Sequence, residues 1–342
     1  MVTTLTFPRW LGEGKLAEAH PEVSKLRREP TNGDLWGRSW AGNPRTPLSN
    51  GLQNLPTIRT RGFNGLVPRE WASLSRNVIR GVSPPRDLSS RTHGATFPVP
   101  LAERVVRVYS AEGDLVVDPF LGTGTTLVAA RRWNRRGTGI ELSSRFCRIA
   151  RGKLGQRSLI DEWGYPPNVI NDDCRNIRRH VADNSTRLVL TSPPYANFIR
   201  RSIGDRERTH KQSVLVEQNG SAVKPYSENP LDFGNLTYDA FLRQLAPLMR
   251  DLFTITIPGG YNVWVVKDYR DPSSHRSYVD FHSDIAHIGE KMGFRYHDLI
   301  VWDQNEDRSL IVLGYPTVFY ANQNCSFLVV LRKPPTRPTS PA

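Results

Sequence analysis

Residues 114–126 read DLVVDPFLGTGTT, an apolar strand followed by a glycine loop and the start of a helix. Gly122 and Gly124 allow the backbone to come close to a ligand, because glycine carries no side chain. A triphosphate loop is excluded, since no lysine follows the second glycine and the carboxylate of Asp118 would repel phosphate. The stretch therefore predicts a cofactor loop in an α/β fold, suited to a cationic cofactor.

Two further strands are predicted to end in carboxylates. Residues 137–141 read GTGIE, which places Glu141 where it can accept hydrogen bonds from ribose hydroxyls. Residues 168–173 read NVINDD and repeat the pattern, with Asp173 at the strand end. The sequence thus predicts three acidic strand ends along one α/β sheet.

A second motif lies at residues 187–195, which read RLVLTSPPY. The apolar run predicts a buried strand that stops at Pro193 and Pro194. Both prolines lack an N–H and have a fixed φ, so the backbone carbonyls become pre-aimed acceptors beside Ser192 Oγ and the Tyr195 ring. Such a pocket can hold a planar aromatic amine by its exocyclic NH₂. For this motif alone, a strand that leaves the sheet through a Pro-Pro turn is the alternative.

Together the two motifs resemble those of the DNA amino methyltransferases, which use S-adenosylmethionine to modify exocyclic nitrogens. Residues 118–126 resemble the family's D-P-F-x-G-x-G-T-T cofactor loop, and residues 191–195 its catalytic [DNS]-P-P-[YFW] motif. Residues 93–98, HGATFP, are similar to the stretch that lies against the methionine end of the cofactor. Here the cofactor loop precedes the catalytic motif, so the order is permuted relative to the family's commonest arrangement. The resemblance extends over about residues 91–333.

The resemblance implies a doubly wound, seven-stranded, Rossmann-like α/β methyltransferase sheet. It implies S-adenosylmethionine as the cofactor and no metal, with Asp173 near the adenine amino group. The catalytic residues that it implies are Ser192, Pro193, Pro194 and Tyr195. The cofactor-binding residues that it implies are Phe97, Asp118, Pro119, Phe120, Gly122, Gly124, Thr125, Thr126, Glu141 and Asp173.

Composition divides the chain near residue 90. Residues 1–90 are rich in Pro, Gly, Asn, Arg and Trp with little periodicity, and we expect an irregular basic extension that either contacts DNA or wraps the core. Residues 91–334 are the predicted catalytic domain, and 335–342 a tail. Within that domain, the basic segment 199–230 is a candidate DNA-contacting loop, with a surface insertion as the alternative. Helices are expected over 101–109, 238–252 and 281–292, and strands over 261–266, 296–302 and 325–331.

The net charge and the cysteine pattern limit the kinds of partner and metal that the chain is expected to bind. The 342 residues carry a formal net charge of +13, which favours a polyanionic partner such as nucleic acid. The three cysteines are scattered without C-x-x-C spacing, so we expect neither disulfides nor zinc, and a cytoplasmic location. No long apolar run suggests a membrane span. The oligomeric state and the presence of a restriction or defence partner are left open.

The resemblance also implies the reaction. The target base is flipped out of duplex DNA and stacked on Tyr195, and its amino group is held between Ser192 Oγ and the Pro193 carbonyl for direct methyl transfer. Among relatives, Ser before the two prolines is associated more with cytosine N4 and Asp or Asn more with adenine N6. We therefore expect cytosine N4, with adenine N6 as the alternative. An RNA amino methyltransferase and a dinucleotide enzyme are the competing classes.

Overall fold

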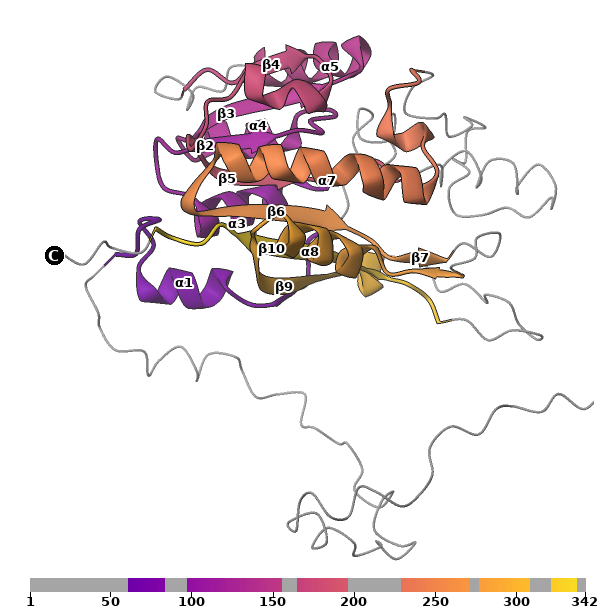
Figure 1. Ribbon diagram of the computed structural model, residues 1–342. Helices are drawn as coiled ribbons and strands as arrows, with labels where there is room; N and C mark the ends of the chain where they lie inside the picture. Colours follow the sequence, from indigo (N-terminus) through magenta and orange to yellow (C-terminus); the bar gives the residue numbers. More distant parts are fainter. Residues whose placement is uncertain are drawn as a thin grey trace, which may run out of the picture. The chain divides into compact units, whose positions relative to one another are not determined.

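The computed structural model describes residues 61–83, 97–155, 165–195, 229–270, 277–307 and 321–336. All of them lie in the compact unit Asn54–Ala342. Its centre is a sheet with the strand order β1-β9-β10-β6-β5-β2-β3-β4, and β7 and β8 form a separate antiparallel pair (Figure 1). The strands are β1 (Val78–Ile79), β2 (Leu115–Asp118), β3 (Arg136–Glu141), β4 (Asn168–Asn171), β5 (Thr186–Thr191), β6 (Thr256–Val266), β7 (Tyr269–Arg270), β8 (Tyr278–Val279), β9 (Arg295–Asp303) and β10 (Cys325–Arg332).

The pairing of the strands brings the predicted motifs to one edge of the sheet. β2 runs parallel to both β3 and β5, β3 runs parallel to β4, and β5 runs parallel to β6. Only β10 runs antiparallel within the described part of this sheet, against both β6 and β9. Because parallel strands share an edge at their carboxyl ends, Asp118, Glu141 and Thr191 end neighbouring strands on the same side. The doubly wound α/β architecture is confirmed.

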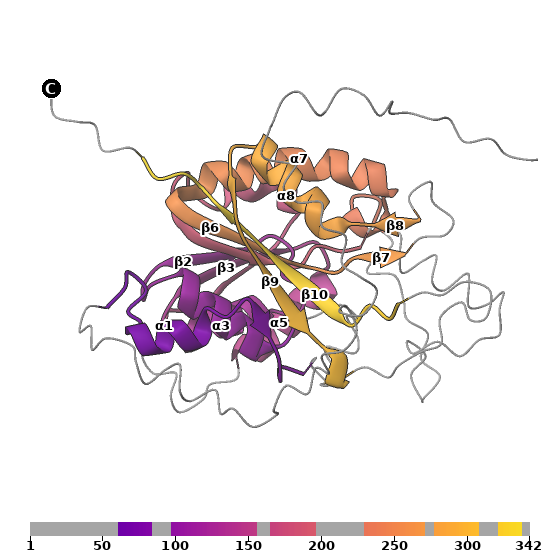
Figure 2. The same cartoon turned by 90° about the horizontal axis from the view of Figure 1, so that it is seen from below.

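Helices cover both faces of the sheet, with α7 and α8 on one face and α1, α3 and α5 on the other (Figure 2). The apolar residues Phe241, Leu245, Leu248 and Leu252 recur along one side of α7 and are buried, which explains why this segment packs as an amphipathic helix. The helices are α1 (Pro68–Leu74), α3 (Val99–Tyr109), α4 (Thr125–Arg132), α5 (Ser144–Gly155), α7 (Tyr238–Ile255) and α8 (Phe281–Lys291), with short 3₁₀ helices η3 (Cys174–Arg179), η4 (Phe233–Asn235) and η5 (Asn305–Asp307).

The structure differs from the sequence expectation over residues 61–83. Instead of an irregular extension, these residues form α1 and β1, and β1 adds an eighth strand parallel to β9. Asn64 Nδ2 donates to the Val108 carbonyl at 2.8 Å, and Trp302 Nε1 donates to the Val82 carbonyl at 2.8 Å. These long-range hydrogen bonds pack residues 61–83 against the predicted catalytic domain.

Several predicted segments lie outside the described residues. They are 1–60 and 84–90 of the predicted extension, 91–96 and 199–228 of the predicted catalytic domain, and 337–342 of the tail. The helices predicted over 101–109, 238–252 and 281–292 correspond to α3, α7 and α8, and the strands predicted over 261–266, 296–302 and 325–331 correspond to β6, β9 and β10. No helix in the described ranges is both long and apolar enough to cross a membrane.

Candidate functional site

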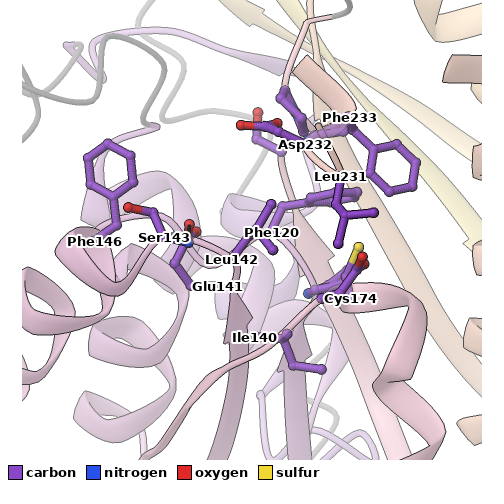
Figure 3. A pocket seen from close by; sticks show the side chains of 15 residues that line it. Phe120, Ile140, Glu141, Leu142, Ser143, Phe146, Cys174, Leu231, Asp232 and Phe233 are labelled. Carbon is purple, nitrogen blue, oxygen red and sulfur yellow. Dashed lines mark hydrogen bonds between the residues drawn. The ribbon is translucent and has the colours of Figure 1, made fainter. Parts of the chain in front are cut away.

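A pocket of about 620 Å³, open to solvent, lies where the carboxyl ends of the central strands meet (Figure 3). From the first motif, Pro119 and Phe120 line it, and from the second, Ser192, Pro193 and Pro194 line it. The two predicted motifs therefore share one pocket. The acidic strand-end residues Glu141 and Asp173 line it as well.

Glu141 connects the glycine loop to the start of α5. Its Oε2 accepts a hydrogen bond from the Gly122 amide at 2.8 Å, and its Oε1 accepts one from the Ser143 amide at 2.8 Å. Burial raises the pKa of Glu141 to about 7, although the two amides favour the charged form. Each carboxylate oxygen keeps a further lone pair, so Glu141 can still accept hydrogen bonds from a bound ligand.

Asp118 is buried and does not line the pocket. Its Oδ1 accepts from the Phe120 amide at 3.0 Å and from Thr191 Oγ1 at 2.7 Å, and its Oδ2 accepts from Thr126 Oγ1 at 2.6 Å. Burial raises the pKa of Asp118 to about 6, and the three hydrogen bonds act in the opposite direction. Asp118 thus joins the cofactor loop and α4 to the strand that carries Ser192.

The glycine loop has the backbone shape that the sequence suggested. Gly122 and Gly124 have φ values of 54° and 90°, in the left-handed region that disfavours other residues. A Cβ on Gly124 would also lie 3.1 Å from the Cβ of Ala150 on α5. Neither glycine lines the pocket, and their direct contact with a cofactor stays a prediction.

Three other predicted cofactor residues lie away from the pocket lining. Thr125 and Thr126 are buried in the first turn of α4, and the Thr126 hydroxyl is bonded to Asp118. Phe97 is buried in the core cluster that contains α3. Residues 93–96, which precede Phe97 in the predicted methionine-contacting stretch, lie outside the described residues.

Arg175 holds Asp173 and the adjacent pocket wall together. Asp173 Oδ2 accepts from Arg175 Nη1 at 2.5 Å, and Arg175 also donates to the Leu231 carbonyl at 3.0 Å and 3.1 Å. The Arg175 guanidinium lies over the Phe233 ring, 4.4 Å from its centroid. In Figure 3, Leu231 and Phe233 lie across the pocket from Phe146, with Glu141 and Leu142 between them.

Sequence reasoning missed both apolar walls. Phe146 had a usable signal, because it follows Glu141 closely in the first turns of α5, next to a predicted strand end. Leu231, Asp232 and Phe233 had none, since they follow a long segment without helical or strand periodicity. They are brought to the pocket by Arg175 and by η4, whose second residue, Gly234, donates its amide to Asp232 Oδ1 at 2.8 Å.

Ser192 and Tyr195 occupy different surroundings. Ser192 lines the pocket, and its hydroxyl has no hydrogen-bond partner among the described residues. Tyr195 is not part of the lining. Its ring contacts those of Tyr269 and Phe281, with centroids 6.0 Å and 5.9 Å away. These ring contacts fix the orientation of Tyr195 beside the pocket, and its stacking role stays a prediction.

One group in the described part of the chain has the donor set for a metal. Asp268, Asp280 and His282 place their ligand atoms within 4.8 Å of one another. His282 Nδ1 is already 2.8 Å from Asp268 Oδ2 and 3.0 Å from Asp280 Oδ1, so these three side chains contact one another directly.

Comparison with known proteins gives matches to DNA-modifying enzymes. Residues 16–152 match the family described as DNA methylase, of the N6/N4 type. The match includes the glycine loop and Glu141 and ends before Ser192. The chain is 41% identical over 88 residues to the Type II methyltransferase M.MthZI of Methanothermobacter thermautotrophicus, covering 25% of each chain.

Two further similarities are short or distant. The chain is 47% identical over 62 residues to the orphan methyltransferase M.BamHII of Bacillus amyloliquefaciens, covering 18% of this chain and 23% of that one. It thus spans about a quarter of the length of these curated relatives. A SAM-dependent methyltransferase from Methanosarcina mazei is 12% identical with a TM-score of 0.42, covering 68% of this chain and 97% of that chain.

Proposed function

We propose that the protein methylates an exocyclic amino group in duplex DNA, and the match of residues 16–152 to the N6/N4 DNA methylase family supports this proposal. The methyl donor is S-adenosylmethionine and the acceptor is N4 of cytosine. The observation that carries the proposal is the shared pocket, in which Phe120 from the glycine loop and Ser192 from the Ser-Pro-Pro-Tyr motif both form the lining.

The pocket has the donor and acceptor set that S-adenosylmethionine requires. Glu141 accepts hydrogen bonds from the ribose hydroxyls, and Asp173 accepts one from the adenine amino group. Phe146 and Phe233 supply apolar walls for the planar adenine ring of S-adenosylmethionine. Carboxylates around a pocket also favour a cation over a phosphate. When bound, S-adenosylmethionine supplies an electrophilic methyl group.

Ser192 and Pro193 act on the acceptor amine. The Ser192 hydroxyl oxygen and the Pro193 carbonyl each accept one N–H of the exocyclic amino group, which orients the nitrogen lone pair away from the ring. An amine conjugated to a base is a poor nucleophile, so this localisation of the lone pair is the main chemical task. The Tyr195 ring stacks against the base that has been flipped out of the duplex.

Asp118 fixes the position of the glycine loop relative to the strand that ends just before Ser192. The hydrogen bond from Thr191, the residue before Ser192, and the hydrogen bond from the Phe120 amide reach the same carboxylate oxygen. Any shift of the catalytic strand relative to the glycine loop would break one of them. This arrangement supports a permuted methyltransferase, because strand pairing and not chain order brings the two motifs together.

The choice of cytosine rests on Ser192, since the family resemblance associates a serine at this position with cytosine N4. The net charge of +13 supports a polyanionic substrate. Adenine N6 is the second candidate for the acceptor, and the same residues would hold its amino group.

Nucleoside analysis tests the proposal. The protein is incubated with duplex DNA and S-adenosylmethionine that carries an isotope-labelled methyl group, and the DNA is digested and analysed by mass spectrometry. We expect labelled N4-methylcytosine, formed much more slowly by the Ser192→Ala variant. Labelled N6-methyladenine would show that the acceptor is adenine and not cytosine. Labelled 5-methylcytosine would overturn the amino-group mechanism. Methylation of RNA in preference to DNA would overturn the proposal that duplex DNA is the substrate.

A further inference from the structure

The antiparallel pair β7–β8 projects beyond the carboxyl edge of the main sheet (Figures 1 and 2). β7 begins three residues after the end of β6, and β8 ends two residues before the start of α8. Residues 271–276, which connect the two strands, lie outside the described residues. The described base of the hairpin therefore lies next to the proposed catalytic edge.

Ring contacts join the hairpin to the Ser-Pro-Pro-Tyr motif. Tyr269 of β7 meets the Tyr195 ring nearly at right angles, with an interplanar angle of 88°. Phe281, which follows β8 and begins α8, meets the same ring at 62°. Both ends of the hairpin thus contact the tyrosine that we propose to stack on the flipped base.

A buried carboxylate fixes the hairpin in place. Asp268, directly before β7, is 4% exposed and accepts from the His282 amide at 3.1 Å as well as from its ring. The Tyr278 hydroxyl of β8 donates to Asp268 Oδ2 at 3.4 Å. The two strands are consequently held to the same residue, and the Tyr278 ring is oriented by its own hydroxyl.

The outer surface of the hairpin combines an aromatic ring with a cation. Tyr278 is 47% exposed although its hydroxyl is bonded inward. The Arg270 guanidinium lies 5.8 Å from the centre of this ring, and its Nη1 donates to the Ala321 carbonyl at 3.1 Å. With the Arg270 guanidinium over one face, the Tyr278 ring can stack on a base through its other face while the cation neutralises a phosphate.

We propose that the hairpin is a DNA-contacting element that supports base flipping. Tyr278 stacks on a base of the duplex next to the flipped target, and Arg270 binds a neighbouring phosphate. Stacking on the remaining bases offsets part of the energy lost when the target base leaves the helix. The inference rests on the proposed function, because it needs a target base at Tyr195.

Binding measurements with a duplex that the wild-type protein methylates test the inference. The variants are Tyr278→Ala, Tyr278→Phe and Arg270→Ala, and affinities are measured by fluorescence anisotropy over a range of salt concentrations. Tyr165→Ala is the matched control, since Tyr165 is 43% exposed and precedes β4 at the opposite edge of the sheet. Calorimetry with S-adenosylmethionine checks that each variant binds the cofactor with wild-type affinity.

Loss of the Tyr278 ring should weaken DNA binding roughly 5- to 150-fold with an unchanged salt dependence, because stacking releases no counterions. Tyr278→Phe should bind within about threefold of wild type, since its ring still stacks. Arg270→Ala should lower the slope of log affinity against log salt by about one.

Two results would overturn the inference alone. The first is a Tyr278→Ala variant that binds DNA with wild-type affinity and still methylates it, as expected if the hairpin binds a protein partner. The second is an equal loss of DNA affinity in Tyr278→Ala and Tyr165→Ala. If the wild-type protein methylates no duplex at all, the proposed function fails, and the inference fails with it.

Discussion

Replacing Thr191 with valine should uncouple the catalytic strand from the glycine loop. Valine keeps the shape of threonine and removes one hydroxyl, which donates to Asp118 at 2.7 Å in the protein interior. A hydrogen bond to a charged group contributes about 1.5–3 kcal/mol, so the free energy of unfolding should fall by that amount. Methyl transfer should fall as well, because Ser192 is the next residue in the chain.

The same strand provides the control for this prediction. Thr186 is also fully buried in β5, but its hydroxyl has no hydrogen-bond partner within the described part of the chain. Thr186→Val should therefore be neutral or stabilising, because it removes an unpaired buried hydroxyl. Urea denaturation followed by circular dichroism measures both variants, and equal slopes against denaturant would show that the unfolding transition is unchanged.

The pH dependence makes the prediction sharper. The pKa of Asp118 is raised to about 6, so its carboxylate is protonated in the folded state at pH 5 and ionised at pH 8. The Thr191 donor matters most for the ionised form, and the loss in Thr191→Val should therefore grow as the pH rises from 5 to 8. A cost no larger than that of Thr186→Val, or one independent of pH, would refute the role assigned to this hydrogen bond.

Three further predictions concern the ligands. Affinity for S-adenosylmethionine should rise from pH 6 to pH 8, because the Glu141 pKa is about 7 and the ionised form accepts ribose hydroxyl bonds more strongly; calorimetry should show no such rise in Glu141→Gln. Ser192→Ala should raise the activation free energy of methyl transfer by about 2–3 kcal/mol without changing cofactor affinity. Tyr195→Phe should lower the methylation rate less than Tyr195→Ala does, and equal losses of rate in the two variants would contradict stacking. Neutralising the Arg and Lys residues of 199–230 should weaken DNA binding and flatten its salt dependence without changing cofactor affinity, and an unchanged salt slope would exclude this segment as a phosphate contact.

Local sequence signals were enough to predict the ends of the central strands. Apolar runs that stop at Asp118, Glu141 and Ser192 indicate strands with polar carboxyl ends, and parallel pairing then brings those ends together. The shared pocket follows from this rule. The short strand β1 gave no such signal, since only Val78 and Ile79 form it and its position depends on pairing with β9.

Long-range contacts explain what the sequence could not show. Asp118 was predicted to bind the cofactor, but hydroxyls from Thr126 and Thr191 surround its carboxylate, and Thr191 is 73 residues away in the chain. The wall at Leu231 likewise depends on Arg175, 56 residues earlier. Such pairs join residues that are far apart in the chain, so neither spacing nor periodicity predicts them.

The clamp between Arg175 and Leu231 has a thermodynamic consequence. In the sequence, the basic segment 199–230 lies between Tyr195 and Leu231, and Leu231 lines the pocket. If a nucleic acid bound this segment and displaced Leu231, the free energy of the pocket wall and of any cofactor bound against it would change. Linkage then requires that the cofactor changes the affinity for nucleic acid by the same factor. Such a coupling would act through the Leu231 carbonyl, which accepts both hydrogen bonds from Arg175.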